Sequence, residues 1–198
     1  MLPTAAAQPA GRIFFSKSFP GSAPAYFEVA LEQDGQAAYR ESTDDDQPLR
    51  FQLSPADAQE IFGLAEKLQY FQAPLESKLR VANMGMKTFR YQSGQTRGEA
   101  KFNYSERLEA RALLDWFEKI AETEQHLVAL ERTARYDRLG VNKALLLLDV
   151  SWDKNRIVAP EQLLPILDKI ARGASYMHIA QVRAASLAER IRAGKPKN

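Results

Sequence analysis

Three consecutive carboxylates, Asp44-Asp45-Asp46, are the densest group of potential metal ligands in the sequence. A calcium ion needs about six to eight oxygen ligands, which a suitably curved loop brings together. Three adjacent side chains cannot all point at one ion. We therefore interpret residues 42–48 as a solvated hairpin loop and assign no metal site to it.

The stretch 141–171 has the outline of a calcium-binding EF-hand, with a helix pattern, a polar loop and a second helix pattern. With Ile157 in the apolar loop position, the first three ligand positions hold Val150, Trp152 and Lys154, which cannot replace carboxylates. A second frame has matching residues at Asp149, Ser151, Asp153 and Asn155. That frame fails because Arg156 takes the apolar position and Pro160 the bidentate one, so we interpret the stretch as a helical hairpin with a polar turn.

The two histidines, His126 and His178, lie in different predicted helices without a second ligand at metal-binding spacing. The sequence has no cysteine, no Gly-x-Ser-x-Gly elbow, no phosphate-binding glycine loop and no His-Glu-x-x-His helix. Its serines, Ser151 among them, have no base nearby in the sequence, which leaves remote partners open. We name no catalytic, cofactor-binding or metal-ligating residue and expect no cofactor, and a small hydrolase with an unrecognised site stays an alternative.

Aromatic residues recur along the predicted strands, at Tyr26, Tyr39, Phe51, Phe89, Tyr91, Phe102 and Tyr104. Together with Lys87, Arg90 and Lys101, they could form a stacking surface for single-stranded nucleic acid. Aromatic residues that alternate along an amphipathic sheet more commonly form its core face. We interpret them as core residues and do not expect the strands to bind nucleic acid.

The composition is that of a globular protein: 198 residues, 45% hydrophobic and 26% charged, with a formal net charge of +2. From Leu139 onward there are 10 Lys+Arg against 5 Asp+Glu, which leaves 17 against 20 before it. We interpret this basic tail as a solvated helical face. A cytosolic protein that binds nucleic acid through the basic C-terminal helices stays an alternative. No apolar run is long enough for a transmembrane segment.

The stretch 105–138 contains no Gly or Pro and predicts one long helix with Ser105 as its N-cap. Its predicted buried stripe consists of Leu108, Ala112, Leu113, Trp116, Phe117 and Ile120. A break at 122–124 is left open. Strand patterns precede this helix and helix patterns follow it, so it joins two differently built parts of the chain.

The first part alternates as strands do at 12–18, 25–33, 37–41, 49–53, 87–92 and 99–104. Asp34-Gly35 predicts a type I′ hairpin turn, and Ser54-Pro55 predicts the start of a helix. The predicted fold class is α+β, an antiparallel β-sheet with helices packed on one face. Helix patterns from Val141, from Pro160 and from a cap at Ser175 add an all-α C-terminal subdomain, with Ile157-Val158 briefly extended between the first two.

These patterns divide the chain into a disordered leader at 1–10, an α+β domain at 11–121 and a helical subdomain at 122–198 that continues from the long helix. The small residues of Thr4-Ala5-Ala6-Ala7, followed by Gln8, are typical of the cleavage end of a secretory signal. They predict a periplasmic or secreted protein. A flexible leader on a cytoplasmic protein is the alternative.

Four features occur in order along the first half: Asp34-Gly35, Tyr39, Tyr70-Phe71 and Lys87-Thr88-Phe89. In this order they resemble an uncharacterised bacterial domain family found in exported and lipoprotein-like proteins. Members often carry cysteines before the first hairpin, where this chain has Phe19-Pro-Gly-Ser22, so no disulfide is implied. The resemblance implies export but no activity. We therefore predict a non-enzymatic binding or protein-interaction module of the bacterial envelope, with the open sheet face or the basic tail as its contact surface.

Overall fold

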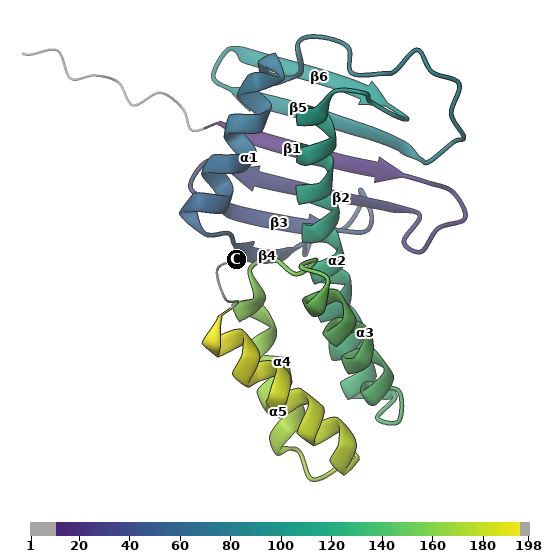
Figure 1. Ribbon diagram of the computed structural model, residues 1–198, viewed down its shortest axis with the longest axis vertical. Coiled ribbons are helices and arrows are strands. Elements are labelled where there is room, and N and C mark those ends of the chain that lie inside the picture. The colour runs from purple at the N-terminus through teal and green to yellow at the C-terminus, as the bar shows by residue number, and fades with distance from the viewer. Residues whose placement is uncertain (1–10, 195–198) are drawn as a thin grey trace, which may run out of the picture. The chain divides into compact units, whose positions relative to one another are not determined.

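The computed structural model describes residues 11–194, which form two compact units divided after Glu118. The predicted division lay three residues later, after Ala121. Unit 1 (11–118) has an antiparallel sheet with helices on one face, and unit 2 (119–194) is all-α (Figure 1). The α+β fold class predicted from the sequence is confirmed.

The sheet of unit 1 has six strands, and every neighbouring pair is antiparallel. They are β1 (Arg12–Ser18), β2 (Tyr26–Glu32), β3 (Gln36–Arg40), β4 (Leu49–Gln52), β5 (Met86–Ser93) and β6 (Thr96–Phe102). Their order across the sheet is β4-β3-β2-β1-β5-β6. The strand β1 therefore pairs with β5, which follows it only after three further strands and a helix.

One face of this sheet is the core of unit 1. Helices α1 (Pro55–Lys67) and α2 (Leu108–Tyr136) cross it (Figure 1). The ring of Phe117 stacks on Phe15 with 5.0 Å between ring centroids, and Phe89 lies 5.9 Å from the Phe117 ring. A 3₁₀ turn, η1 (Gln69–Phe71), adds Phe71 beside Phe89. Buried aromatic rings contribute more than other side chains to such a core, because each removes a large apolar area from water.

The start of α1 follows the prediction: the Oγ of Ser54 accepts a hydrogen bond from the amide of Asp57 at 3.1 Å, and Pro55 is the first helical residue. The start of α2 does not. It begins at Leu108, whose side chain is 74% exposed, whereas Ser105 is buried. Within unit 1 the buried side of α2 consists of Ala110, Leu113 and Phe117.

The predicted stripe of α2 was therefore out of phase at its start, since Leu108 and Ala112 are exposed. A helix can place small alanines on its buried side where the sheet comes close, and such a side is not recognised by counting large apolar residues. The helix continues without a break through 122–124.

Two hairpin loops of unit 1 differ in length from the prediction. The loop between β2 and β3 is longer than predicted, and the loop between β5 and β6 is shorter. Between β2 and β3 the loop is three residues long, and only Gly35 has a positive φ, of 88°. The amide of Gln36 donates to the carboxylate of Asp34 at 2.9 Å. This is a three-residue loop that ends in a left-handed glycine, so the predicted type I′ turn is wrong. Between β5 and β6 only residues 94–95 form the turn.

Unit 2 contains residues 119–136 of α2, then α3 (Val141–Asp153), a 3₁₀ turn η2 (Pro160–Leu163), α4 (Leu164–Arg172) and α5 (His178–Ala193). Its core includes Leu130, Leu145, Leu148, Trp152, Leu167, Ile170 and Leu187. The predicted extended pair Ile157-Val158 is buried but forms no strand. The helix that Pro160 was expected to open begins instead as η2, and α4 ends with Gly173 as its C-cap.

Helix α5 differs most from its predicted form. It begins at His178 with no side-chain cap, so Ser175 does not cap it. The large apolar side chains of Ile179 and Val182 are 53% and 54% exposed. Alanines and leucines of the opposite side are buried instead, at Ala180, Ala184, Leu187 and Ala188. Small buried residues allow a close approach between helices, and this preference outweighs the side-chain size that guided the prediction.

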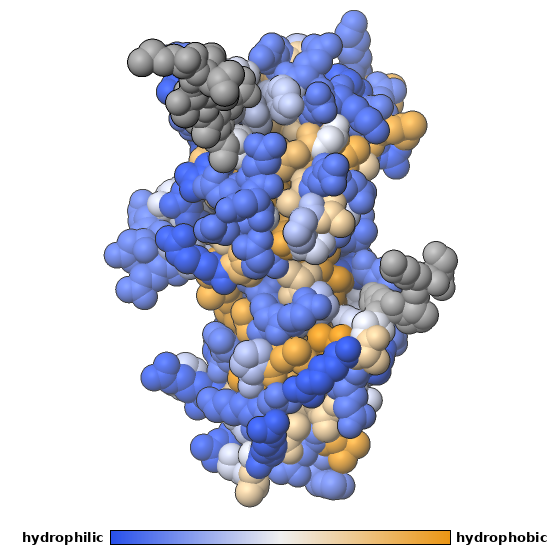
Figure 2. Space-filling view, turned by 90° about the vertical axis from the view of Figure 1, so that its left-hand side faces the viewer, coloured by the Kyte–Doolittle hydropathy of each residue, from blue (hydrophilic) through white to orange (hydrophobic). Residues whose placement is uncertain are grey.

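Within residues 11–194, no helix is both long enough and apolar enough to cross a membrane. On the side shown in Figure 2, hydrophilic side chains cover most of the surface and hydrophobic ones are visible between them. Such a mixture is ordinary for protein surfaces, of which more than half is contributed by apolar atoms.

Two glycines of unit 1 test the packing around η1. A Cβ atom at Gly98 of β6 would lie 1.9 Å from the backbone oxygen of Tyr70, whereas a Cβ at Gly63 of α1 would meet nothing within 4 Å. We expect Gly98→Ala to destabilise the protein by roughly 1–3 kcal/mol or more, because η1 must move away from the sheet. Gly63→Ala should stabilise it by up to about 1 kcal/mol, through helix propensity. Urea denaturation measures both, and equal effects would contradict this packing.

Candidate functional site

The face of the sheet opposite the helices carries an array of charged side chains from all six strands. We call it the open face. It consists of Arg12, Phe14, Ser16, Tyr26, Glu28, Ala30, Glu32, Ala38, Arg40, Arg50, Thr88, Arg90, Gln92, Arg97, Glu99 and Lys101, which alternate along their strands with core residues. Alternation follows from the two-residue repeat of a strand.

Strand register places one row of residues straight across this face. From β4 to β6 the row reads Arg50, Ala38, Ala30, Phe14, Arg90 and Glu99. Its middle is apolar, with two alanines and Phe14, and an arginine lies on each side of that middle. Because neighbouring strands are about 4.8 Å apart, Arg50 and Arg90 start roughly 19 Å from each other at the backbone.

Cations outnumber anions on the open face by six to three. Three of the six cations have ion pairs: Arg12 with Glu32, Arg40 with Glu28 at 2.6 Å, and Lys101 with Glu99 at 3.2 Å. The other three, Arg50, Arg90 and Arg97, are exposed and have no acidic partner among residues 11–194. The face therefore carries a surplus of three positive charges on arginine side chains.

Phe14 lies at the centre of this charge distribution. The guanidinium carbon of Arg90 is 4.4 Å from the centroid of the Phe14 ring, and that of Arg12 is 5.3 Å away. Cations over an aromatic ring are attracted by its negative face. These contacts hold two arginines above the middle of the sheet without neutralising either of them.

A shallow hollow of about 120 Å³ lies on the open face beside this row. Its lining includes Ala30 and Ala38, whose short side chains leave the space, together with Arg12, Glu32 and Arg50. A hollow of this volume suits one side chain of a partner, whereas pockets for drug-sized ligands measure about 300–1,000 Å³.

The aromatic set considered from the sequence does not form one surface. Five of its members are buried on the core face: Tyr39, Phe51, Phe89, Tyr91 and Phe102. Lys87 also lies on the core face, opposite to that of Arg90 and Lys101. Only Tyr26 belongs to the open face. Phe14, Arg12 and Arg50 were not singled out from the sequence, because only the strand register shows that they are neighbours.

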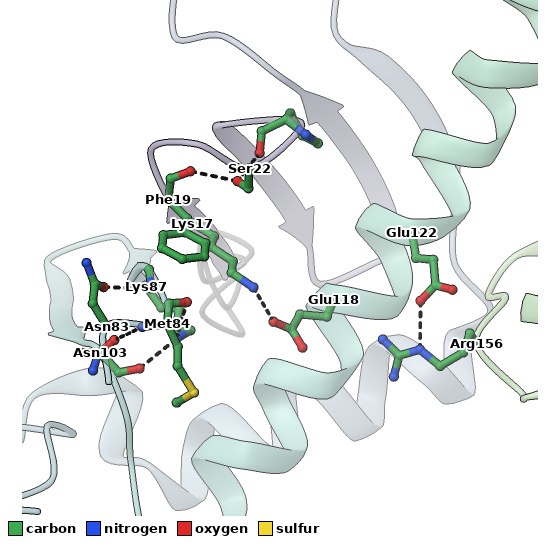
Figure 3. Close-up of polar contacts among 12 residues, drawn as sticks. Lys17, Phe19, Ser22, Asn83, Met84, Lys87, Asn103, Glu118, Glu122 and Arg156 are labelled. Atoms are coloured by element: carbon green, nitrogen blue, oxygen red, sulfur yellow. Dashed lines mark hydrogen bonds and ion pairs between the residues drawn. The ribbon is translucent and has the colours of Figure 1, made fainter. Parts of the chain in front are cut away.

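In unit 2 the structure brings together a serine and a histidine. The Oγ of Ser151 on α3 lies 2.9 Å from Nε2 of His126 on α2 and donates to Oε1 of Glu122 at 2.6 Å. The other oxygen of Glu122 accepts from Arg156 at 2.8 Å (Figure 3). The remote base that a serine nucleophile needs is thus present in space, although not in sequence.

The direction of these hydrogen bonds does not suit nucleophilic catalysis. The single O–H group of Ser151 donates its hydrogen bond to Glu122. In the contact between Ser151 and His126, Nε2 of His126 must therefore be the donor. A serine nucleophile requires the reverse, with the histidine as base. Burial lowers the pKa of His126, which favours the neutral ring. We interpret the group as a polar network that ties α3 to α2 within unit 2.

The residues considered as calcium ligands have other contacts. Asp149 and Asp153 both form ion pairs with Arg190 of α5, and the first of these measures 2.5 Å. In the polar loop, the carboxylate of Asp45 accepts from the amide of Gln47 at 2.9 Å. His178, the first residue of α5, is exposed. Among the described residues, no group of three or more potential ligands is arranged to hold a metal ion.

Glu124 of α2 is the most strongly perturbed acid of unit 2. Its side chain is 1% exposed, and neither carboxylate oxygen makes a hydrogen bond. Burial raises the pKa of Glu124 to about 7, and the nearby amide of Gln162 offsets this only in part, without reaching hydrogen-bonding geometry. We treat this buried carboxylate as a determinant of stability.

Known proteins add no functional information for this chain. No protein-family model matches the sequence. A search of curated proteins likewise finds no match. The resemblance to an exported bacterial domain family stays a prediction, and the candidate site rests on the structure.

The pH dependence of stability should reveal Glu124. Because its pKa is higher in the folded state than in the unfolded state, its protonated form favours folding, and this contribution disappears as pH rises from about 4.5 to about 7. We expect Glu124→Gln to be more stable than the wild type at pH 8, by at most roughly 3 kcal/mol, and similar at pH 4.5. Urea denaturation followed by circular dichroism measures this.

The control is Glu131→Gln, which alters an exposed carboxylate on the same helix. It should follow the wild type at both pH values. An identical pH dependence in Glu124→Gln and in the wild type would contradict the assigned role of this carboxylate.

Proposed function

We propose that the protein is a non-enzymatic binding module of the bacterial envelope, and that its open face binds an acidic segment of a partner protein. The observation that carries this proposal is the surplus of Arg50, Arg90 and Arg97, which share the open face and lack acidic partners among the described residues.

Arginine is well suited to this task. Its planar guanidinium donates two parallel hydrogen bonds to a carboxylate, and it loses less hydration on contact than a lysine ammonium does. Three exposed arginines spread over β4, β5 and β6 match a partner segment that carries several carboxylates. The hollow beside Ala30 and Ala38 would accept one of its side chains.

A protein segment fits this face better than single-stranded nucleic acid does. Nucleic-acid sheets present free aromatic rings on which bases stack. Here the exposed ring of Phe14 is already covered by Arg90 and Arg12, and Tyr26 donates its hydroxyl to Glu28 at 3.2 Å.

The test uses a fluorescein-labelled hexaglutamate peptide as probe, with binding measured by fluorescence anisotropy. The triple variant Arg50→Gln, Arg90→Gln, Arg97→Gln should bind at least about tenfold more weakly than the wild type, because three charge-assisted contacts are lost. Binding by the wild type should also weaken with added salt.

The matched control removes three exposed cations of unit 1 that lie outside the sheet: Lys67→Gln, Lys78→Gln, Arg80→Gln. This variant has the same net charge as the first and should bind the peptide as the wild type does. Equal weakening in both variants would reduce the effect to overall charge and overturn the proposal. No binding by the wild type, or tighter binding of a labelled oligothymidylate, would do the same.

The envelope part of the proposal rests on the small residues at 4–7 and on the family resemblance, and residues 1–10 lie outside the described part of the chain. We expect the native gene product to be exported and its mature N-terminus to fall near Ala7 or Gln8. Cell fractionation and mass spectrometry of the N-terminus measure this. An uncleaved chain recovered from the cytoplasm would contradict it and would leave the binding proposal for the open face unaffected.

A further inference from the structure

Two lysines lie directly opposite each other on the core face of the sheet. Register pairs Lys17 of β1 with Lys87 of β5, one position beyond the aromatic pair Phe15 and Phe89 along each strand's face. Like charges in directly opposed cross-strand positions repel each other. A sheet keeps such a pair only where other groups compensate both ammonium groups.

Each lysine is compensated differently (Figure 3). Lys17 forms an ion pair with Glu118 of α2 at 2.8 Å. Lys87, only 3% exposed, donates to the backbone oxygens of Asn103 and Met84 at 2.7 and 3.1 Å. An ammonium has three protons to donate, so one proton of Lys87 has no hydrogen-bond partner among residues 11–194.

Both ammonium-bearing side chains line a pocket of about 290 Å³ in unit 1. Its walls are largely apolar, with Met84, Phe102, Ala110 and Leu114. The charged groups of the lining are Lys17, Lys87 and Arg111 against Asp115 and Glu118, which leaves one surplus positive charge. This volume lies just below the usual range for drug-sized ligands, so a small molecule fits it.

We propose that this pocket binds a small amphiphilic carboxylate, whose carboxylate group accepts a hydrogen bond from Lys87 and whose apolar part packs against Phe102 and Leu114. The carboxylate supplies the missing acceptor for the third proton and cancels the surplus charge. The apolar walls gain from covering a hydrocarbon, at about 25 cal/mol per Å² of buried apolar area.

Other ligand classes fit less well. A neutral hydrocarbon leaves the buried N–H without a partner, which is costly in an apolar environment. A cation would add to the surplus positive charge of Lys17, Lys87 and Arg111. A phosphate dianion would exceed the single charge that the lining needs.

The pH dependence of binding should follow Lys87. Burial lowers the pKa of Lys87, and the neighbouring Lys17 lowers it further, while Glu118 and Glu76 act in the opposite direction. A bound carboxylate favours the charged ammonium, so binding requires the proton on Lys87. Affinity for a carboxylate should therefore decrease as pH rises toward and past this lowered pKa, below the range in which exposed lysines lose their protons.

The experiment titrates octanoate into the full chain, with isothermal calorimetry for affinity and amide chemical shifts for location. Octanol and octylamine are the matched ligands. We expect octanoate to bind more tightly than both, with shift changes concentrated at pocket residues such as Met84, Asn103 and Leu114. Lys87→Met should lower octanoate affinity about tenfold or more and abolish its pH dependence. Lys101→Met, on the other face of the sheet, should leave both unchanged.

A second variant keeps the proposal testable if Lys87→Met fails to fold. Leu114→Trp fills the pocket from its apolar wall, keeps both lysines, and should also abolish octanoate binding. The proposal is overturned if octanol binds as tightly as octanoate, if both variants bind octanoate normally, or if the shift changes lie elsewhere. The pocket and the open face lie on opposite sides of the sheet, so this outcome is independent of the peptide experiment.

Discussion

The contact of Phe117 with Phe15 and Phe89 is the interaction on which the arrangement of unit 1 depends. It packs α2 against the neighbouring strands β1 and β5 and so determines which face of the sheet is buried. Once that face is buried, the two-residue repeat of every strand assigns each remaining side chain to one side or the other. The exposed arginines, including Arg50 and Arg90, and the pairing of Lys17 with Lys87 on the core face both follow from this arrangement.

Positive charges have different surroundings on the two faces of the sheet. On the open face, water solvates Arg50 and Arg97, so leaving them without partners costs little and keeps them available for a partner's carboxylates. On the core face, an unpartnered ammonium is expensive, and Lys17 and Lys87 are held by a carboxylate and by backbone oxygens. A buried proton without an acceptor, such as the third one of Lys87, is therefore the more specific indication of a ligand.

Unit 2 shows why proximity of suitable residue types is not sufficient for a catalytic interpretation. Ser151 and His126 are within hydrogen-bonding distance, yet the hydroxyl of Ser151 donates to Glu122. His126 is then the donor to Ser151, whereas a serine nucleophile requires histidine as the acceptor. The carboxylate of Glu124, by contrast, makes no hydrogen bond, and its burial raises its pKa. Both observations concern the position of protons, which is set by the full group of neighbours and not by any pair.

The sequence by itself determined the fold class, most strands, the helix that begins after Ser54, and the separation of Arg90 from Phe89, because each depends on periodicity or on a local cap. Only the tertiary structure decided the phase of α2, the row from Arg50 through Phe14 to Arg90, and the opposition of Lys17 and Lys87. The row and the lysine pair join strands that are distant in the chain, since β1 pairs with β5. Local periodicity says which face a residue occupies, but not which strand will lie beside it.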